Sequence, residues 1–258
     1  MLPSPNKGDN MSDKKFPLKK KDKVAIVGFT GTRELAPYND PDFEIWTVNN
    51  LYRFVPRQDR IFELHTREQI AADLTHGVDG KTYVEEMAAM KIPVYMQEQY
   101  PDIPSSIKYP LDEMIREFGV DRSNVNHTPD AYFTNSISFM IALAIYEGFK
   151  EIHVYGVDMA VGVEYIEQRP SCEYYLGIAK GRGIKVYIPI ESDLLKTRFI
   201  YGYDEVRKDA WMKKMESTLQ HMIAQKNQSD MTIRNQQSVS DKYDGGIMTI
   251  KEMMKTWN

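Results

Sequence analysis

The amino-acid sequence predicts an α/β fold, in which a Rossmann-like, mostly parallel sheet is flanked by helices and followed by a C-terminal helical extension. Short apolar runs recur along the chain, and segments with helical periodicity lie between them. Strands that alternate with helices of about ten residues are typical of βαβ units, which join parallel strands by right-handed crossovers. This alternation stops after Tyr203, so we expect one domain over residues 23–203 and an extension over residues 204–258.

Six apolar runs predict the strands. The first, residues 24–28, is continuous and ends in glycine, which is typical of a strand buried on both faces. Similar runs occupy residues 44–49, 60–65, 93–96, 152–158 and 185–189. Periodic segments at residues 84–90, 111–118, 136–147 and 172–180 predict helices between these strands. Gly148 and Gly181 stand at the ends of two of these segments, as glycine often does at helix termini.

The first 22 residues predict a disordered basic tail. Residues 1–23 contain seven lysines and three aspartates, a net charge of +4, together with three prolines and few apolar residues. The simplest interpretation is a solubilising leader. The alternative is a weak electrostatic arm for nucleic acid or another acidic surface.

Two apolar stripes predict helices in the C-terminal extension. The first comprises Trp211, Met212, Met215, Leu219, Met222 and Ile223, and the second comprises Ile247, Ile250, Met253, Met254 and Trp257. The polar segment 226–242 separates them, and seven of the fifteen methionines lie beyond Tyr203. Methionine-rich faces suit adaptable packing, so we expect helices that dock on their own domain or on a second copy in a homo-oligomer.

Composition excludes several classes of protein. The 33 Lys and Arg residues against 37 Asp and Glu residues give a net charge of −4, which argues against nucleic acid as a partner. No run approaches the roughly 18 apolar residues of a membrane span, and the first twenty residues lack the apolar stretch of a secretory signal. A cytoplasmic protein is therefore expected. The single cysteine, Cys172, leaves neither an internal disulfide nor a cysteine-based zinc site.

The loops that follow the strands are the places to look for function, because ligands of such sheets bind beyond the carboxyl ends of the strands. The first loop contains Gly28, Thr30, Gly31, Thr32 and Arg33. Glycines let a phosphate approach the backbone, while the threonine hydroxyls and the arginine supply hydrogen bonds and charge. The alternative is a tight turn between strand and helix with a threonine cap.

Two asparagines, Asn49 and Asn50, follow the second strand, at the place where a doubly wound sheet contacts a ribose or a base. An asparagine side chain offers both a donor and an acceptor. The absence of an acidic residue at this strand end argues against the NAD fingerprint. The alternative is a local turn stabilised by an asparagine side chain.

Two further loops carry polar side chains at strand or helix ends. His65 ends the third strand and is a candidate general base or sugar contact, or else a partly buried histidine with a structural hydrogen bond. Thr134 or Asn135 is a candidate cap for the helix over residues 136–147, where free amides beside Ser136 would bind an anion or a ribose.

The richest polar cluster of the sequence follows the strand that ends in Gly156 and Asp158. It also contains Glu164, Tyr165, Glu167, Arg169 and Glu173. Asp158 is a candidate to orient a substrate, or to hold Mg²⁺ or Mn²⁺ together with Glu164 or Glu167, because hard cations prefer carboxylate oxygens. Its alternative role is to cap a helix.

In their order along the chain, these motifs resemble those of bacterial sialyltransferases that use CMP-sialic acid. The resemblance covers roughly residues 23–195 and is carried by residues 24–33, 46–50, 135–136 and 148–158. The group of proteins similar to 6-hydroxymethylpterin diphosphokinase shares this pattern. Segments 34–37, 169–174 and 201–203 also resemble uncharacterised bacteriophage-encoded proteins, a closer match that implies no reaction.

The resemblance implies contacts with a nucleotide. Gly28, Thr30, Gly31 and Thr32 would meet a phosphate or a cytidine-like nucleotide, Asn49 the ribose or base, and Ser136 the nucleotide, with Gly156 and Asp158 beneath it. Two features depart from the sialyltransferase pattern. The first loop lacks the Asn and Pro of that pattern, and residues 159–185 contain no histidine to act as the base.

We therefore expect a protein that binds a nucleotide or nucleotide-sugar and catalyses a glycosyltransferase-like transfer. The candidate bases are Asp158, Glu173 and His65, Arg33 would assist the phosphate, and Arg169 and Tyr174 would bind the acceptor. The alternative is a non-catalytic protein that sequesters a nucleotide or forms a scaffold through its C-terminal helices.

Overall fold

The computed structural model describes residues 18–72, 80–119, 132–160, 162, 164–197, 200, 203 and 206–256. Most of the predicted basic tail lies outside these residues. By its internal contacts the chain divides into two compact units, Met1–Lys196 and Thr197–Asn258.

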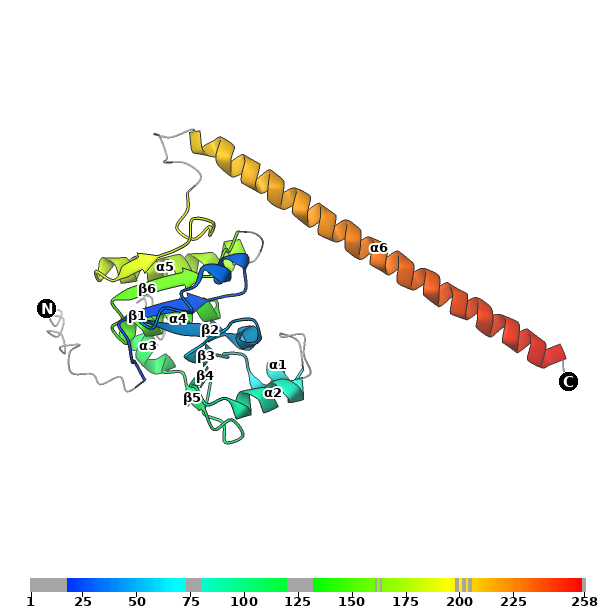
Figure 1. The fold of residues 1–258 in the computed structure, drawn as a ribbon, viewed down its shortest axis with the longest axis horizontal. Coiled ribbons are helices and arrows are strands. Elements are labelled where there is room, and N and C mark those ends of the chain that lie inside the picture. Colours follow the sequence, from blue (N-terminus) through cyan, green and yellow to red (C-terminus); the bar gives the residue numbers. More distant parts are fainter. Residues whose placement is uncertain are drawn as a thin grey trace, which may run out of the picture. The chain divides into compact units, whose positions relative to one another are not determined.

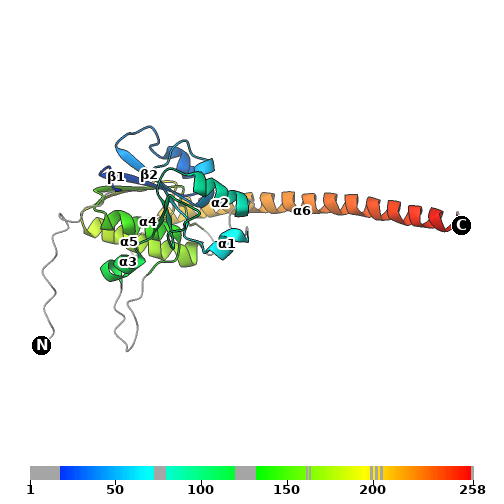
Figure 2. The same cartoon turned by 90° about the horizontal axis from the view of Figure 1, so that it is seen from below.

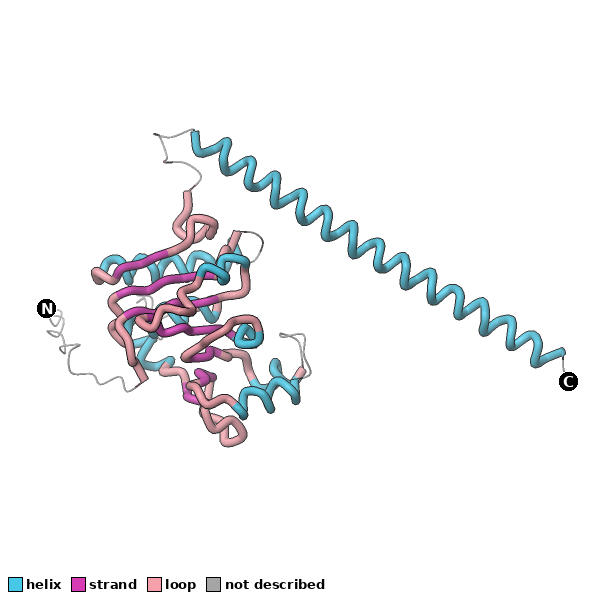
Figure 3. Tube along the Cα trace, viewed as in Figure 1, coloured by secondary structure: helices cyan, strands magenta, loops and turns pink. Residues whose placement is uncertain are grey.

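A seven-stranded sheet forms the centre of the first unit within the described residues (Figures 1 and 3). Its spatial order is β5-β4-β3-β2-β1-β6-β7, and all six neighbouring pairs are parallel. The strands are β1 Lys23–Val27, β2 Phe43–Val48, β3 Arg60–Phe62, β4 Val94–Met96, β5 Ser106–Lys108, β6 Glu151–Tyr155 and β7 Lys185–Tyr187. The predicted α/β fold with a parallel sheet is confirmed.

The strands differ from the predicted ones mainly in three respects. Strand β6 ends at Tyr155, whereas the apolar pattern predicted a strand up to Asp158, so Gly156 and Asp158 belong to the loop beyond it. Strand β5 was not predicted, because Ser-Ile-Lys is too short and too polar to form an apolar run. Strand β3 ends at Phe62, whereas the apolar pattern predicted a strand up to His65. His65 therefore belongs to the loop beyond the strand and not to the sheet.

The helices of this unit are α1 Arg67–Ala71, α2 Gly80–Ala89, α3 Leu111–Phe118, α4 Ser136–Tyr146 and α5 Arg169–Gly181. Four of them match the predicted helical segments. The fifth, α1, was not predicted from periodicity. It begins at a capping box, in which the Thr66 hydroxyl accepts from the Gln69 amide and the Gln69 side chain accepts from the Thr66 amide.

The two faces of the sheet are covered differently. Helices α3, α4 and α5 lie together on one side of the strands (Figure 2) and share the main apolar core with it. Two short 3₁₀ helices, η2 Gly31–Leu35 and η3 Asn49–Arg53, follow β1 and β2, and a smaller apolar cluster lies between these loops and the other face. The sheet is thus buried on both faces, which explains its continuous apolar strands.

Helix α4 is the most deeply buried helix of the core. Eight of its eleven residues are buried, and a helix that is apolar all round is expected to be enclosed by its neighbours. Its position is therefore set by packing along its whole length, and its first residues, which point towards the carboxyl ends of the strands, are held firmly.

A buried ionic cluster joins the sheet to the end of α4. The guanidinium of Arg60 on β3 contacts Glu147 Oε1 at 2.7 Å and Glu44 Oε2 at 2.9 Å. The Trp46 indole donates to the same Glu44 oxygen at 2.9 Å. Burial raises the pKa of Glu147, although Arg60 opposes this shift. One cation therefore compensates two buried carboxylates.

The C-terminal unit contains one continuous helix, α6 Val206–Thr256, of 51 residues. The prediction of two helices separated by a polar segment was wrong, since α6 runs through residues 226–242 and through Gly245 and Gly246 (Figure 3). Polar residues such as Gln, Lys and Asp do not interrupt a helix, and a single pair of glycines costs only about 2 kcal/mol. None of the helices in the described part of the chain is both long and apolar enough to span a membrane.

Replacing Arg60 tests the buried cluster. We expect Arg60→Met to lower the free energy of unfolding by about 3–5 kcal/mol, because it leaves buried carboxylates without a partner. The control is Arg116→Met, which removes an exposed pair with Glu113 and should change stability by less than about 1 kcal/mol. Urea denaturation measures both. Equal effects of the two substitutions would contradict this account of the cluster.

Candidate functional site

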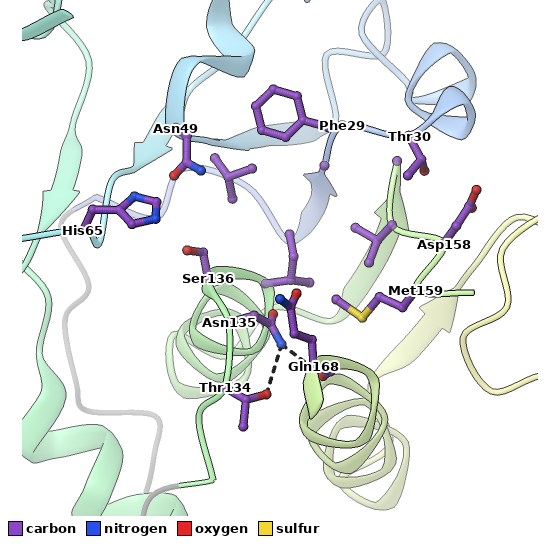
Figure 4. Close-up of a pocket in the computed structure, with 15 residues that line it drawn as sticks. Phe29, Thr30, Asn49, His65, Thr134, Asn135, Ser136, Asp158, Met159 and Gln168 are labelled. Carbon is purple, nitrogen blue, oxygen red and sulfur yellow. Dashed lines mark hydrogen bonds between the residues drawn. The ribbon is translucent and has the colours of Figure 1, made fainter. Parts of the chain in front are cut away.

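A pocket of about 400 Å³ lies at the carboxyl ends of the central strands (Figure 4). The chain adds strands on one side of β1 up to β5 and then returns to place β6 on the other side of β1. Such a switch point is where open α/β sheets bind ligands. The lining residues are Gly28, Phe29, Thr30, Val48, Asn49, His65, Thr134, Asn135, Ser136, Ile137, Gly156, Val157, Asp158, Met159 and Gln168.

Two glycines allow β1 and β6 to meet beneath the pocket. A Cβ atom on Gly28 would collide with the Gly156 carbonyl, and a Cβ atom on Gly156 would collide with the Gly28 carbonyl. Gly156 also has φ = +65°, a conformation that favours glycine. The Gly28 amide donates to the Tyr155 carbonyl at 2.8 Å, and the Thr30 amide donates to the Gly156 carbonyl at 2.9 Å. Both glycines line the pocket, but their first role is to let the backbone segments after β1 and β6 come into contact.

The remainder of the predicted phosphate loop supports this junction. The Thr32 hydroxyl accepts from the Gly156 amide at 2.8 Å and is buried. Arg33 donates to the Phe29 carbonyl and pairs with Glu34. Gly31, Thr32 and Arg33 are not among the lining residues, whereas Thr30 is. The structure therefore brings only the first part of the predicted loop to the pocket.

The N-terminus of α4 faces the pocket through Ser136 and Ile137. Asn135 is its cap, since the side-chain oxygen accepts from the Ser138 amide at 3.0 Å. The cap leaves the first amides of the helix directed at the pocket, where the helix dipole also favours negative charge. Of the two predicted caps, Thr134 and Asn135, the structure selects Asn135.

Helix α5 fixes this cap in place. The Asn135 side-chain nitrogen donates to the Gln168 carbonyl at 3.0 Å and to the Ser171 hydroxyl at 3.1 Å. Thr134 and Ser171 share a hydrogen bond of 2.6 Å. Because both functions of the Asn135 amide are used, the start of α4 is a rigid wall of the pocket.

Asn49 presents a hydrogen-bonding group to the pocket. Its backbone has φ = +50°, which is uncommon for a residue other than glycine. Its side-chain oxygen is buried and has no hydrogen-bond partner among the residues described, and the same holds for the Thr30 hydroxyl. Strain and unsatisfied polar atoms gather at functional sites. Asn50, in contrast, is buried and does not line the pocket.

His65 is oriented by a buried carboxylate. Its Nδ1 lies 2.6 Å from Glu63 Oε1, and Tyr83 donates to Glu63 Oε2 at 2.5 Å. Glu63 and Tyr83 are fully buried. The hydrogen bond to Glu63 raises the pKa of the His65 imidazole, although burial opposes the shift. A histidine held by a carboxylate at the edge of a cavity is an arrangement suited to general base catalysis.

Asp158 lines the pocket on the side opposite His65 (Figure 4). The other predicted residues of this cluster lie elsewhere. Glu173 accepts from Arg169 at 2.7 Å and from the Leu195 amide at 2.7 Å, and Arg169 also donates to the Lys196 carbonyl. Glu173, Arg169 and Tyr174 are absent from the pocket lining. The first two instead fasten the segment that follows β7 to α5.

The predicted Mg²⁺ or Mn²⁺ site remains a prediction. In the part of the chain that the structure describes, there is no group of three or more His, Cys, Asp or Glu residues placed to hold a metal ion. Asp158 lines the pocket, while Glu167 is exposed and is not part of its lining.

Sequence reasoning missed three contributors to the site. Phe29, at the mouth of the pocket, is 42% exposed, and the sequence offered only its place between Gly28 and Thr30 as a signal. Gln168 lines the pocket from the segment before α5. Glu63 carries no motif, and its only signal in the sequence is its spacing of two residues from His65, which places the two side chains on the same face of an extended segment.

The Glu63–His65 pair makes the protein sensitive to pH. Because the folded-state pKa of His65 is raised above the unfolded value of about 6.5, the pair contributes stability below that pH and loses it as pH rises through the folded-state pKa. We expect an NMR titration to give a pKa above 6.5 for His65 and a lower value in Glu63→Gln.

The control for this titration is Glu86→Gln. Glu86 binds Tyr52 and Arg53, whereas the pKa of His65 is shifted by Glu63 and by burial. The Glu86→Gln substitution should therefore leave the pKa of His65 unchanged. If Glu63→Gln also left it unchanged, Glu63 would not be the cause of the shift.

Comparisons with known proteins complete the description. No protein-family model matches the chain, and no curated protein matches it. Among solved structures it is similar to the sialyltransferase CstII from Campylobacter jejuni in complex with the substrate analogue CMP-3FNeuAc, with 17% identity and a TM-score of 0.42 over 64% of this chain and 79% of that chain.

Two other solved structures from the same organism are also similar. The monofunctional α-2,3-sialyltransferase Cst-I has 11% identity and a TM-score of 0.40, covering 78% of this chain and 96% of that chain. An α-2,3-sialyltransferase in apo form has 14% identity and a TM-score of 0.38, covering 65% of this chain and 75% of that chain. Likenesses at this level identify neither a substrate nor a reaction for this chain.

Proposed function

We propose that the pocket binds the nucleotide part of a nucleotide-sugar and that the protein is a glycosyltransferase-like transferase. The observation that carries this proposal is Asn49, whose buried side-chain oxygen lacks a partner among the described residues and faces the cavity. Leaving a buried acceptor unsatisfied costs about 1–3 kcal/mol, so a ligand that supplies a donor to this oxygen gains affinity. The hydroxyls of a ribose and the amino group of a base are such donors.

The phosphate of the ligand would lie at the N-terminus of α4. The amides of Ser136 and Ile137 and about half a positive charge from the helix dipole suit one phosphate group. The Thr30 hydroxyl, also unpartnered among the described residues, lies on the other side of the pocket and offers a further hydrogen bond (Figure 4).

Phe29 supports the same assignment for the base. Its ring is exposed and lines the mouth of the pocket on the side of Asn49 (Figure 4). Stacking on an aromatic ring contributes about 1–3 kcal/mol per base and tolerates any base. The resemblance of the sequence to enzymes that use CMP-sialic acid favours cytosine as this base.

In this proposal His65 is the base of the transfer. It would take the proton from an acceptor hydroxyl, whose oxygen then forms a bond to the anomeric carbon of the sugar. The bond from that carbon to the phosphate oxygen breaks, and the electron pair leaves with the nucleotide. Glu63 stabilises the imidazolium that forms.

A second cavity offers a place for the acceptor. It has a volume of about 810 Å³ and includes Leu64, Tyr109, Asp112, Glu113 and Phe139. Leu64 lines this cavity and His65 lines the first one, so the two cavities border consecutive residues. Arg169 and Tyr174 remain predictions as acceptor contacts.

Nucleotide binding is the first test. We expect calorimetry with CMP, UMP, AMP, GMP and their sugar conjugates, with and without Mg²⁺ or Mn²⁺, to find selective binding by the full chain. Asn49→Ala and Phe29→Ala should each weaken the affinity by about 1–3 kcal/mol. The control is Phe54→Ala, an exposed phenylalanine outside the pocket. Binding that is absent, or equal in all variants, would refute the proposed pocket.

Turnover tests the role of His65. We expect His65→Gln to reduce kcat by about 10²–10⁴-fold, because a positioned base contributes that much, while nucleotide affinity stays within twofold. The rate of the unmodified chain should rise with pH through the raised pKa of His65. The control is His153→Gln, a strand residue bound to Glu151 and Tyr155.

Two outcomes would redirect this assignment. If Asp158→Asn abolished turnover while His65→Gln did not, the base would be Asp158. Nucleotide binding without any sugar transfer or hydrolysis would favour the non-catalytic alternative, in which the protein sequesters its ligand.

A further inference from the structure

Helix α6 carries a seven-residue repeat along almost its whole length. With Met212 as position a, fourteen a and d positions follow at heptad spacing up to residue 257. Ten of them are apolar, namely Met212, Met215, Leu219, Met222, Ile233, Tyr243, Ile247, Ile250, Met254 and, beyond the described residues, Trp257. A period of 3.5 residues over this many heptads is the pattern of a coiled coil.

The apolar a and d side chains of α6 that the structure describes are exposed, except Met215, which is half-buried. Leu219 is 55% exposed, Ile247 49% and Ile250 60%. A helix of 51 residues extends about 77 Å at 1.5 Å per residue, and helices of this kind owe their stability to the packing of one apolar face. The face therefore needs an occupant of similar length, and a second α6 has that length and the complementary pattern.

We propose that α6 pairs with the α6 helix of a second copy of this chain as an antiparallel coiled coil. The pattern is nearly symmetric about its centre, because the four polar a and d residues, Lys226, Ser229, Gln236 and Ser240, lie in the middle around Ile233, and the other apolar ones lie at both ends. In an antiparallel pair, Leu219 faces the partner's Ile250 and Met222 faces the partner's Ile247.

Charge selects this orientation over the parallel one. A parallel pair places Lys226 against the partner's Lys226, whereas an antiparallel pair places it against the partner's Tyr243. All six g positions from 218 to 253 are uncharged, so a parallel pair has no ion pairs between e and g positions. An antiparallel pair brings the e-position residue Glu216 beside the partner's Lys251.

The oligomeric state of the full chain tests the pairing. We expect a dimer by sedimentation equilibrium at micromolar concentration. Met222→Asp with Ile247→Asp introduces four carboxylates into the seam and should weaken the dimer at least 100-fold. The matched control is Met231→Asp with Met248→Asp, on the same helix but at outer positions f and b, where both methionines are exposed.

The domain must remain folded for this comparison. Both double variants should keep the thermal unfolding transition of the first unit, measured by tryptophan fluorescence, since buried Trp46 reports on the sheet. A monomeric unmodified chain, or a dimer that survives aspartates at 222 and 247, would overturn the proposal.

Cross-linking tests the orientation. In the antiparallel pair, a chain with Leu219→Cys should form a disulfide only when mixed with a chain carrying Ile250→Cys, because position 219 lies about 46 Å from its own copy. The native Cys172 is buried, and the unmodified chain gives the background. A disulfide formed by Leu219→Cys alone would show a parallel pair and overturn the antiparallel assignment.

Discussion

The close contact between Gly28 and Gly156 is the constraint on which the site depends. The two backbones touch at the switch point, where no side chain fits, and Thr32 secures the contact by accepting from the Gly156 amide. This contact holds the loops after β1 and β6 together and lets them diverge beyond it. The pocket opens at that divergence, where Phe29, Thr30 and Asp158 all contribute to its lining.

The walls of the pocket combine satisfied and unsatisfied polar groups. Asn135 uses both ends of its amide to cap α4 and bind α5, so that wall is rigid. Asn49 and Thr30 keep buried oxygens without partners among the described residues. Such a distribution indicates a site prepared for a polar ligand, because unsatisfied groups cost stability unless a ligand completes them. His65 adds reactivity, since a fully buried carboxylate fixes its orientation.

The two units of the chain differ in how far they bury their own apolar side chains. The first unit buries the faces of its sheet within itself and even encloses an ion cluster around Arg60. The second unit is a single helix whose apolar positions are exposed along its length. The core of the first unit is complete in itself, whereas the proposed pairing with another chain would supply one for the second unit. Ligand binding and assembly would then be carried by separate parts of the sequence.

By itself, the sequence determined the alternation of strands and helices, because hydrophobic periodicity is a local property. It also indicated which loops matter, and Asn49, His65, Ser136 and Asp158 do line one pocket. Only the tertiary structure decided the partners of each side chain. Arg33 binds a nearby carbonyl, Glu173 holds the segment after β7, and Glu63 meets both His65 and Tyr83. The contacts of Glu63 with Tyr83 and of Glu173 with the Leu195 amide join residues that are 20 and 22 positions apart, so they depend on how separate segments fold together, which periodicity does not encode.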